Sequence, residues 1–62
     1  MTVREIIKLI RADGWNQVRQ RGSHRQFKHG TKPGLVTVAG KATKVLAPKT
    51  EKSILRQAGL LP

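Results

Sequence analysis

Residues 15–38 read WNQVRQRGSHRQFKHGTKPGLVTV, and two short breaks containing glycine divide this stretch into three segments. The first segment is polar with Trp15 and Val18 as apolar anchors, and the third is rich in the β-branched residues that favour strands. The breaks, Arg21-Gly22-Ser23 and Gly30–Gly34, have the composition of turns. Short connections join antiparallel neighbours, so the stretch predicts a three-stranded antiparallel meander. The expected strands are Trp15–Gln20, His24–His29 and Leu35–Val38.

The residues on either side of this stretch predict two helices. Thr2 and Glu5 form a capping-box pattern, and apolar residues then recur at helical spacing until Asp13-Gly14 ends the helix. Thr50–Ala58 is expected to form the second helix, with Gly59 just past its end. Two short amphipathic helices can cover one face of a three-stranded sheet, which predicts an α+β fold in the order α-β-β-β-α. The core-facing helical residues are expected to be Val3, Ile6, Ile7, Ile10, Ile54, Leu55 and Ala58, with Leu9 at the edge.

The length and the remaining connection complete the predicted organisation. Sixty-two residues are enough for one domain, which we expect to span residues 1–62. The connection Ala39–Lys49 is broken by Gly40 and Pro48 and is predicted to be a loop, with Val45 and Leu46 packed against the core. The chain has no cysteine and no apolar run near the roughly 20 residues of a membrane span, so we expect a cytoplasmic protein.

Charge indicates the class of binding partner. Thirteen Lys and Arg residues face three Asp and Glu residues, which gives a formal net charge of +10. Between Gly14 and Thr50 there is no acidic residue at all. A positive field of this kind attracts polyanions, above all nucleic acid, although an acidic protein would satisfy the same field.

The alternation of side chains along residues 24–29 separates two faces of the expected sheet. Phe27 is the only large apolar residue of this segment and should face the helices. Since neighbouring residues of a strand point to opposite sides, Arg25 and His29 share the side of Phe27, near strand ends where they can reach water. The open face then carries His24, Gln26 and Lys28.

An exposed histidine in the most basic part of the chain is suited to acid–base chemistry on RNA. Histidine has an unperturbed pKa near neutrality, and it can take the proton of a ribose 2′-hydroxyl that attacks the adjacent phosphate. Nearby Lys and Arg can stabilise the negative charge that develops on the phosphate. The residues alone leave open that His24 only contacts phosphate or has no role.

Other chemistries have little support in the sequence. Metal binding is not expected, because His24 and His29 should face opposite sides and no carboxylate lies between Gly14 and Thr50. Ser23 is expected to serve the turn rather than a catalytic triad, since no acid is available to orient the imidazole. Trp15 and Phe27 are assigned to the core, so RNA contacts should be made mainly to phosphates. The candidate RNA-binding residues are Arg21, Ser23, Arg25 and Lys28.

Two segments resemble the HicA toxins of bacterial and phage toxin–antitoxin systems. The first is the Gly22-Ser23-His24 turn followed by Phe27, and the second is Ser53–Gly59, which reads SILRQAG. The similarity extends over nearly the whole chain, including Asp13-Gly14-Trp15 at the end of the first helix. The chain departs from the family pattern at Lys41, where a histidine is usual, and at Lys49-Thr50-Glu51, where Gly-Thr-Leu is usual.

The resemblance implies a fold, an activity and a partner. The implied fold is like that of double-stranded-RNA-binding domains, in agreement with the predicted element order. The implied activity is that of an mRNA interferase, an endoribonuclease that cleaves mRNA without the ribosome, with His24 as catalytic residue and no cofactor. The implied partner is a HicB antitoxin that masks the site of a toxin that is monomeric when free. The alternatives are a non-catalytic RNA-binding module and a degenerate toxin that only binds its antitoxin.

Overall fold

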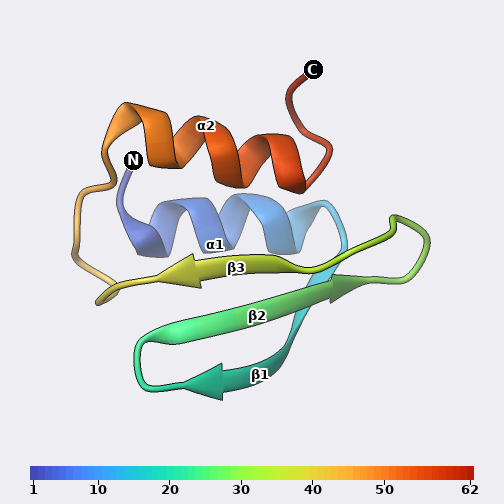
Figure 1. Ribbon diagram of the computed structural model, residues 1–62, viewed down its shortest axis with the longest axis horizontal. Coiled ribbons are helices and arrows are strands. Elements are labelled where there is room, and N and C mark those ends of the chain that lie inside the picture. Colours follow the sequence, from blue (N-terminus) through green and yellow to red (C-terminus); the bar gives the residue numbers. More distant parts are fainter.

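The computed structural model describes all 62 residues and contains two helices and three strands. The strands form one antiparallel sheet in the order β1-β2-β3, and both helices lie on the same side of it (Figure 1). This arrangement confirms the predicted α+β fold and its α-β-β-β-α order. The elements are α1 (Val3–Ala12), β1 (Trp15–Arg21), β2 (His24–His29), β3 (Val36–Ala39) and α2 (Pro48–Gln57).

The core lies between the helices and one face of the sheet. Phe27 of β2 pairs with Val36 of β3, so both side chains point to the helix side, and both are fully buried. Trp15 at the start of β1 is also fully buried, which confirms its assignment to the core. One cluster contains all the buried apolar residues, which are Val3, Ile6, Ile10, Trp15, Phe27, Val36, Val38, Leu46, Ile54 and Ala58.

The helix ends are formed as the sequence predicts. The hydroxyl of Thr2 accepts from the backbone N–H of Glu5 at 3.1 Å, and the Glu5 carboxylate accepts from the backbone N–H of Thr2 at 2.7 Å. This capping box satisfies two N–H groups that an α-helix otherwise leaves unpaired. At the end of α2, Gly59 adopts a positive φ of 71°, and the next residue, Leu60, donates its N–H to the carbonyl of Leu55 at 2.8 Å. That geometry stops the helix and returns Leu60 to the core.

The prediction for β1 is wrong at Val18. Its side chain is 56% exposed and anchors nothing in the core. The pairing of β1 with β2 shifts between Gln17 and Arg19, so Val18 is the extra residue of a β-bulge and has no partner on β2. The strand also continues one residue beyond the expected end, through Arg21.

The exposure of Val45 and the first residues of α2 and β3 differ from the sequence prediction. Leu46 is buried, as predicted, but Val45 is 71% exposed because the chain here pairs with the N-terminal residues. Leu46 donates its N–H to the carbonyl of Met1, and Val45 forms a single bridge with Thr2. The helix α2 begins at Pro48, two positions before the expected start, in agreement with the preference of proline for the first helical turn. The strand β3 begins at Val36, and Leu35 lies outside it.

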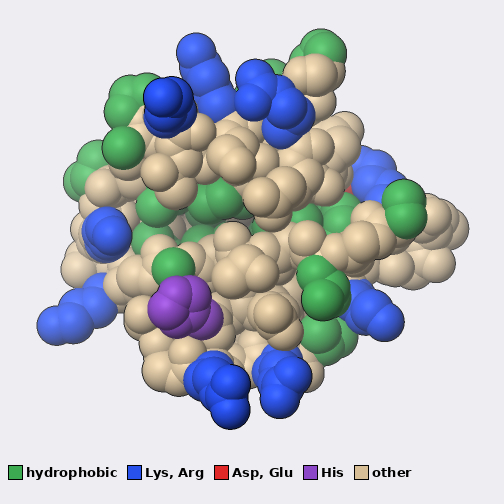
Figure 2. All heavy atoms as spheres, in the orientation of Figure 1, with side chains coloured by type: hydrophobic (Ala, Val, Ile, Leu, Met, Phe, Trp, Pro, Cys, Tyr) green, Lys and Arg blue, Asp and Glu red, His purple; other side chains and the backbone are tan.

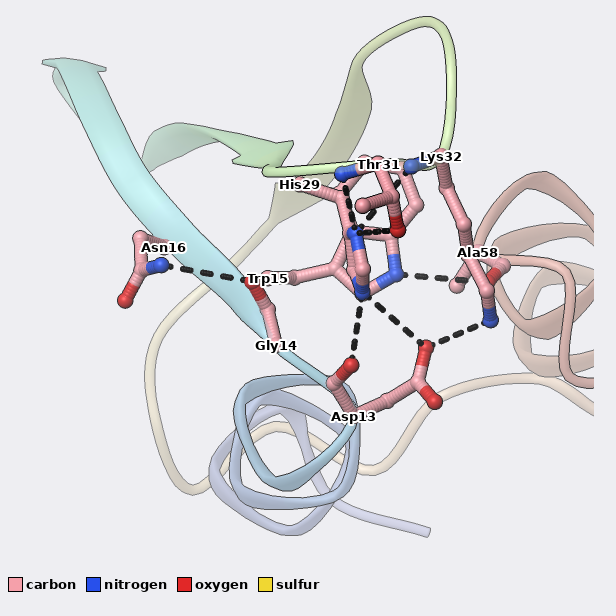
Figure 3. A network of polar contacts seen from close by, with 8 residues as sticks. All are labelled: Asp13, Gly14, Trp15, Asn16, His29, Thr31, Lys32 and Ala58. Carbon is pink, nitrogen blue, oxygen red and sulfur yellow. Dashed lines mark hydrogen bonds and ion pairs between the residues drawn. The ribbon is translucent and has the colours of Figure 1, made fainter.

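A polar network at the far end of β2 fixes the sheet to both helices (Figure 3). The His29 ring nitrogen Nε2 lies 2.7 Å from the carbonyl oxygen of Asp13, and Nδ1 accepts from the backbone N–H groups of Thr31 and Lys32. The ring also meets the Trp15 indole edge to face, with ring centroids 5.3 Å apart. The His29 side chain is only 13% exposed, so the expectation that it reaches water is wrong.

The same network connects the two helices. Trp15 donates its indole N–H to the carbonyl of Ala58 at 3.2 Å, and Lys32 donates to that carbonyl at 3.1 Å. Lys32 also donates to the Asp13 carboxylate at 2.6 Å, and this hydrogen bond lowers the pKa of Asp13 below its ordinary value. Gly14 leaves space for the network, since a methyl group at this position would lie 2.7 Å from Nε2 of His29.

Candidate nucleic-acid interface

His24 projects from the open face of the central strand. It is the first residue of β2, and it pairs with Arg21 on β1 and with Ala39 on β3. The next residue, Arg25, is half-buried and Phe27 is fully buried on the helix side. Because side chains alternate along a strand, His24 points away from the helices, and its side chain is exposed.

The bulge at Val18 determines which arginines join His24. Regular alternation starting from the buried Trp15 would place Arg19 and Arg21 on the helix side of the sheet. The extra residue shifts the register by one, so Arg19 pairs with Gln26 and Arg21 pairs with His24. Both arginines therefore share the open face with their partners, and a β-bulge is a known means of redirecting side chains near a functional site.

These side chains line a shallow hollow of about 190 Å³ around His24. The hollow contains no hydrophobic residue and no carboxylate. Two fixed positive charges, from Arg19 and Arg21, therefore lie beside an imidazole with no acidic side chain among the lining residues to compete for them. An anionic phosphate is the group that this combination of donors favours. The lining residues are Arg19, Arg21, His24, Gln26 and Thr37.

The wider surface has the same sign of charge. Figure 2 shows Lys and Arg side chains around the margins of the face on which histidine is visible, and almost no acidic side chain. Of the three acids of the chain, Glu51 pairs with the terminal amine of Met1 and Asp13 pairs with Lys32. The acids near the surface are thus largely neutralised by local partners, and the field over the open face stays positive.

Comparison with known families assigns this arrangement to a class. The family model described as the HicA toxin of bacterial toxin–antitoxin systems matches residues 3–60 of the 62. The chain belongs to the HicA toxin family. The HicA role is that of a toxin in a toxin–antitoxin system, and it implies an antitoxin protein as partner. A search of the curated proteins finds no match.

The HicA chain places the RNA-binding candidates in different environments. Arg21 lies in the hollow beside His24, and Lys28 is exposed on the same face of β2. Ser23 is exposed in the turn that precedes His24, and its carbonyl accepts the N–H of Gly40 at 3.2 Å. Arg25 lies on the helix side instead, where its guanidinium donates to the carbonyl of Gly40 at 2.9 Å. Arg25 therefore holds the loop after β3 against β2 and does not face the hollow.

Two residues that line the hollow of this HicA chain are absent from the candidates that the sequence predicts. Arg19 was not expected there, because the bulge that turns it outward has no signature in a segment with so few apolar residues. Thr37 comes from β3, and its alternation with the buried Val36 and Val38 would have indicated the open face. No three His, Cys, Asp or Glu side chains come together to form a metal site, and no helix is long and apolar enough to span a membrane.

Proposed function

We propose that this HicA-family toxin is an endoribonuclease that cleaves mRNA without the ribosome, with His24 as the catalytic residue. The observation that carries the proposal is the exposed imidazole of His24 in a hollow whose other charged residues are Arg19 and Arg21. Membership of a toxin family supports a harmful activity on a cellular target, and the positive field supports RNA as that target.

The chemistry begins at the ribose next to the scissile phosphate. An RNA strand lying across the open face brings a 2′-hydroxyl to the His24 ring, and a neutral ring nitrogen takes the hydroxyl proton. The 2′-oxygen then forms a bond to phosphorus, while the bond from phosphorus to the 5′-oxygen of the next nucleotide breaks. The leaving 5′-oxygen takes up a proton from solvent or from the imidazolium that the first transfer created. The products are a 2′,3′-cyclic phosphate and a 5′-hydroxyl.

The arginines supply the electrostatic part of this mechanism. Negative charge develops on the non-bridging phosphate oxygens as the 2′-oxygen attacks, and fixed cations near those oxygens lower the barrier. Arg19 and Arg21 are placed for this role because they share the hollow with His24. Ser23 precedes His24 in the chain and Lys28 follows it on β2, and both residues are exposed. We propose that they contact the phosphates next to the scissile one. Such contacts position RNA and carry little sequence information.

The proposed partner is a HicB-type antitoxin that covers the His24 hollow, and the proposed place of action is the cytoplasm, where mRNA is found. The net charge of +10 supports an acidic partner, because an acidic protein competes with RNA for the same field. The proposed mechanism uses no metal ion, since the proton transfers are assigned to His24 and the charge stabilisation to arginine.

A substrate lacking one hydroxyl tests the mechanism. We expect purified protein to cleave a short RNA in the presence of EDTA and to leave a cyclic phosphate end. Replacing the ribose at the cleaved position by 2′-deoxyribose should abolish cleavage there without weakening binding, since only the attacking group is removed. Cleavage of the 2′-deoxy substrate, or binding of unmodified RNA without any cleavage, would contradict the proposal. The second result would indicate a non-catalytic RNA-binding module.

A further inference from the structure

A second and larger hollow lies between β3 and α2, outside the site described above. Its volume is about 600 Å³, and Figure 2 shows hydrophobic side chains along its floor between the helices and the strands. The floor includes Leu46 and Ile54, which are core residues, and the rim includes the exposed Val45. This groove is lined by Thr37, Ala39, Lys44, Val45, Leu46, Ala47, Lys49, Thr50, Ser53, Ile54 and Gln57.

One wall of the groove is the free edge of the sheet. β3 is an outer strand, and only β2 pairs with it. Gly40 donates its N–H to the carbonyl of Ser23. This bond shows which residues of β3 turn their backbone groups toward β2 and which turn them away. In an antiparallel ladder every second residue turns its N–H and C=O away from the neighbouring strand. In β3 those residues are Thr37 and Ala39, and both line the groove.

An unpaired strand edge next to an apolar floor is a site where an extended polypeptide can add as a further strand. The backbone groups of Thr37 and Ala39 would pair with the incoming strand, and alternate side chains of that strand would enter the groove. RNA is a poorer occupant, because base binding usually requires exposed aromatic rings. Both large aromatic side chains of this protein, Trp15 and Phe27, are fully buried.

The charge around the groove specifies the polypeptide further. Lys44 and Lys49 line the groove, and no Asp or Glu does. An acidic segment would therefore gain from the local field as well as from backbone pairing. The groove also adjoins the proposed catalytic hollow, because Thr37 lines both.

We propose that the antitoxin inserts an extended acidic segment into this groove as a fourth strand beside β3, with an apolar side chain resting on Leu46 and Ile54. Binding there places the antitoxin against Thr37 and so next to His24, which blocks access of RNA to the hollow. The inhibitory consequence rests on the proposed ribonuclease function, whereas the docking itself does not. Strand addition is consequently tested by binding rather than by cleavage.

A bulky residue on the exposed wall of α2 tests the docking site. Ser53 lines the groove and is exposed, and it is not part of the proposed catalytic hollow, so Ser53→Trp should fill the groove without disturbing the core. The matched control is Lys52→Trp, an exposed neighbour on the same helix that does not line the groove. The control also removes a positive charge, which can only weaken binding of an acidic partner. A control that still binds better than Ser53→Trp therefore cannot owe this difference to charge.

The measurement is the affinity for the purified HicB-type antitoxin of the same toxin–antitoxin pair, determined by calorimetry. We expect Ser53→Trp to weaken binding by about tenfold or more and Lys52→Trp by clearly less, with RNA cleavage kept by both. Unchanged antitoxin affinity in Ser53→Trp, or equal weakening by the two variants, would overturn the proposal. A selective loss of RNA binding in Ser53→Trp would also overturn it and would assign the groove to RNA. If the wild-type protein cleaves no RNA, the ribonuclease proposal fails while the affinity comparison still decides the docking site.

Amide hydrogen exchange provides a second test on the unmodified protein. The amides of Thr37 and Ala39 should exchange rapidly in the free toxin and become protected in the complex with antitoxin, as ladder amides are. The amide of Lys28 lies on the central strand β2, opposite Asn16 of β1 and away from this edge, so its protection should not change and it provides the reference within the same sheet. If the Thr37 and Ala39 amides exchange equally fast in the free toxin and in the complex, strand addition at β3 is excluded. This test holds even if Ser53→Trp is too unstable to study.

Discussion

His24 and His29 occupy the first and last positions of β2, yet they lie in opposite environments. They are an odd number of residues apart, so they face opposite sides of the sheet. The His29 ring is packed against Trp15, and both of its nitrogens lie within hydrogen-bonding distance of partners. The His24 ring is exposed beside two arginines in an open hollow. The comparison separates a histidine that serves the fold from one whose nitrogens are open to a ligand, and only the second is free for the proposed catalytic role.

The contacts of His29 also fix the position of its proton. Nδ1 accepts from two backbone N–H groups, of Thr31 at 3.0 Å and of Lys32 at 3.1 Å, so this nitrogen carries no hydrogen. Nε2 therefore carries the hydrogen and donates a hydrogen bond to the carbonyl oxygen of Asp13. A ring with both nitrogens engaged in this way stabilises the fold and is not open to a substrate. His24 has the freedom that His29 lacks.

The largest expected effect is on catalysis, at His24. His24→Ala should lower the rate of RNA cleavage by roughly 10²–10⁴-fold, the usual contribution of a positioned acid or base. The free energy of unfolding should change by less than about 0.5 kcal/mol, because the side chain is exposed. Cleavage assays and chemical denaturation check the two parts separately. A variant that cleaves RNA at the wild-type rate would show that the chemistry lies elsewhere.

The converse result is expected at His29. His29→Ala removes the hydrogen bonds to the turn and to Asp13 together with the contact to Trp15, so we expect a loss of about 2–3 kcal/mol in the free energy of unfolding. Activity per folded molecule should be kept, since the ring faces away from the hollow. Denaturation curves combined with cleavage assays at low temperature test this. A large loss of activity in fully folded protein would remove the contrast between the two histidines.

A smaller effect is expected for the arginines that the bulge turns outward. Arg19→Ala should weaken RNA binding roughly tenfold. The slope of log affinity against log salt concentration should also fall by about one, the change expected when one phosphate contact is lost. Arg4→Ala is the charge-matched control, since Arg4 is an exposed residue of α1 that does not line the hollow. Binding is measured by fluorescence anisotropy at several salt concentrations. Equal weakening by both variants would mean that only net charge matters and that the bulge has no part in RNA recognition.

The smallest effect concerns pH and the Asp13–Lys32 pair at the His29 end. Because the hydrogen bond from Lys32 lowers the pKa of Asp13, the pair stabilises the fold above the ordinary value of 3.8. This contribution is lost as pH falls through the lowered pKa of the folded state. Lys32→Met should bring the Asp13 pKa back toward its ordinary value in an NMR titration and make unfolding less dependent on pH in this acidic range. An unchanged Asp13 pKa in that variant would show that Lys32 is not the cause.

Local patterns in the sequence predict most of the fold. The capping box at Thr2, the apolar stripe of α1 and the position of Phe27 each depend on near neighbours in the chain, and each is confirmed. The opposite faces of His24 and His29 follow from alternation alone. The bulge at Val18 could not be predicted, because β1 has a single buried residue and its register is set by pairing with β2. The exposure of Val45 likewise depends on residues at the other end of the chain.

The candidate site was predicted in part for the same reason. Arg21 and Lys28 were expected to be available for phosphate, and both are exposed. Arg25 was expected to escape to water from the helix side, but it donates to Gly40, a residue far along the sequence. Which of several arginines faces a ligand is decided by strand register and by long-range hydrogen bonds. Composition predicts the sign of the surface charge but not which residues form the site.

The absence of a side chain at residue 14 makes two distant positions depend on each other. Gly14 adopts a φ of 109°, and any Cβ there would collide with the His29 ring. A smaller residue at position 29 would relieve this collision but not the strain of the positive φ, and it would remove the connection between turn, helix and tryptophan. Position 14 therefore depends on position 29 for space, whereas its positive φ favours glycine whichever residue stands at position 29.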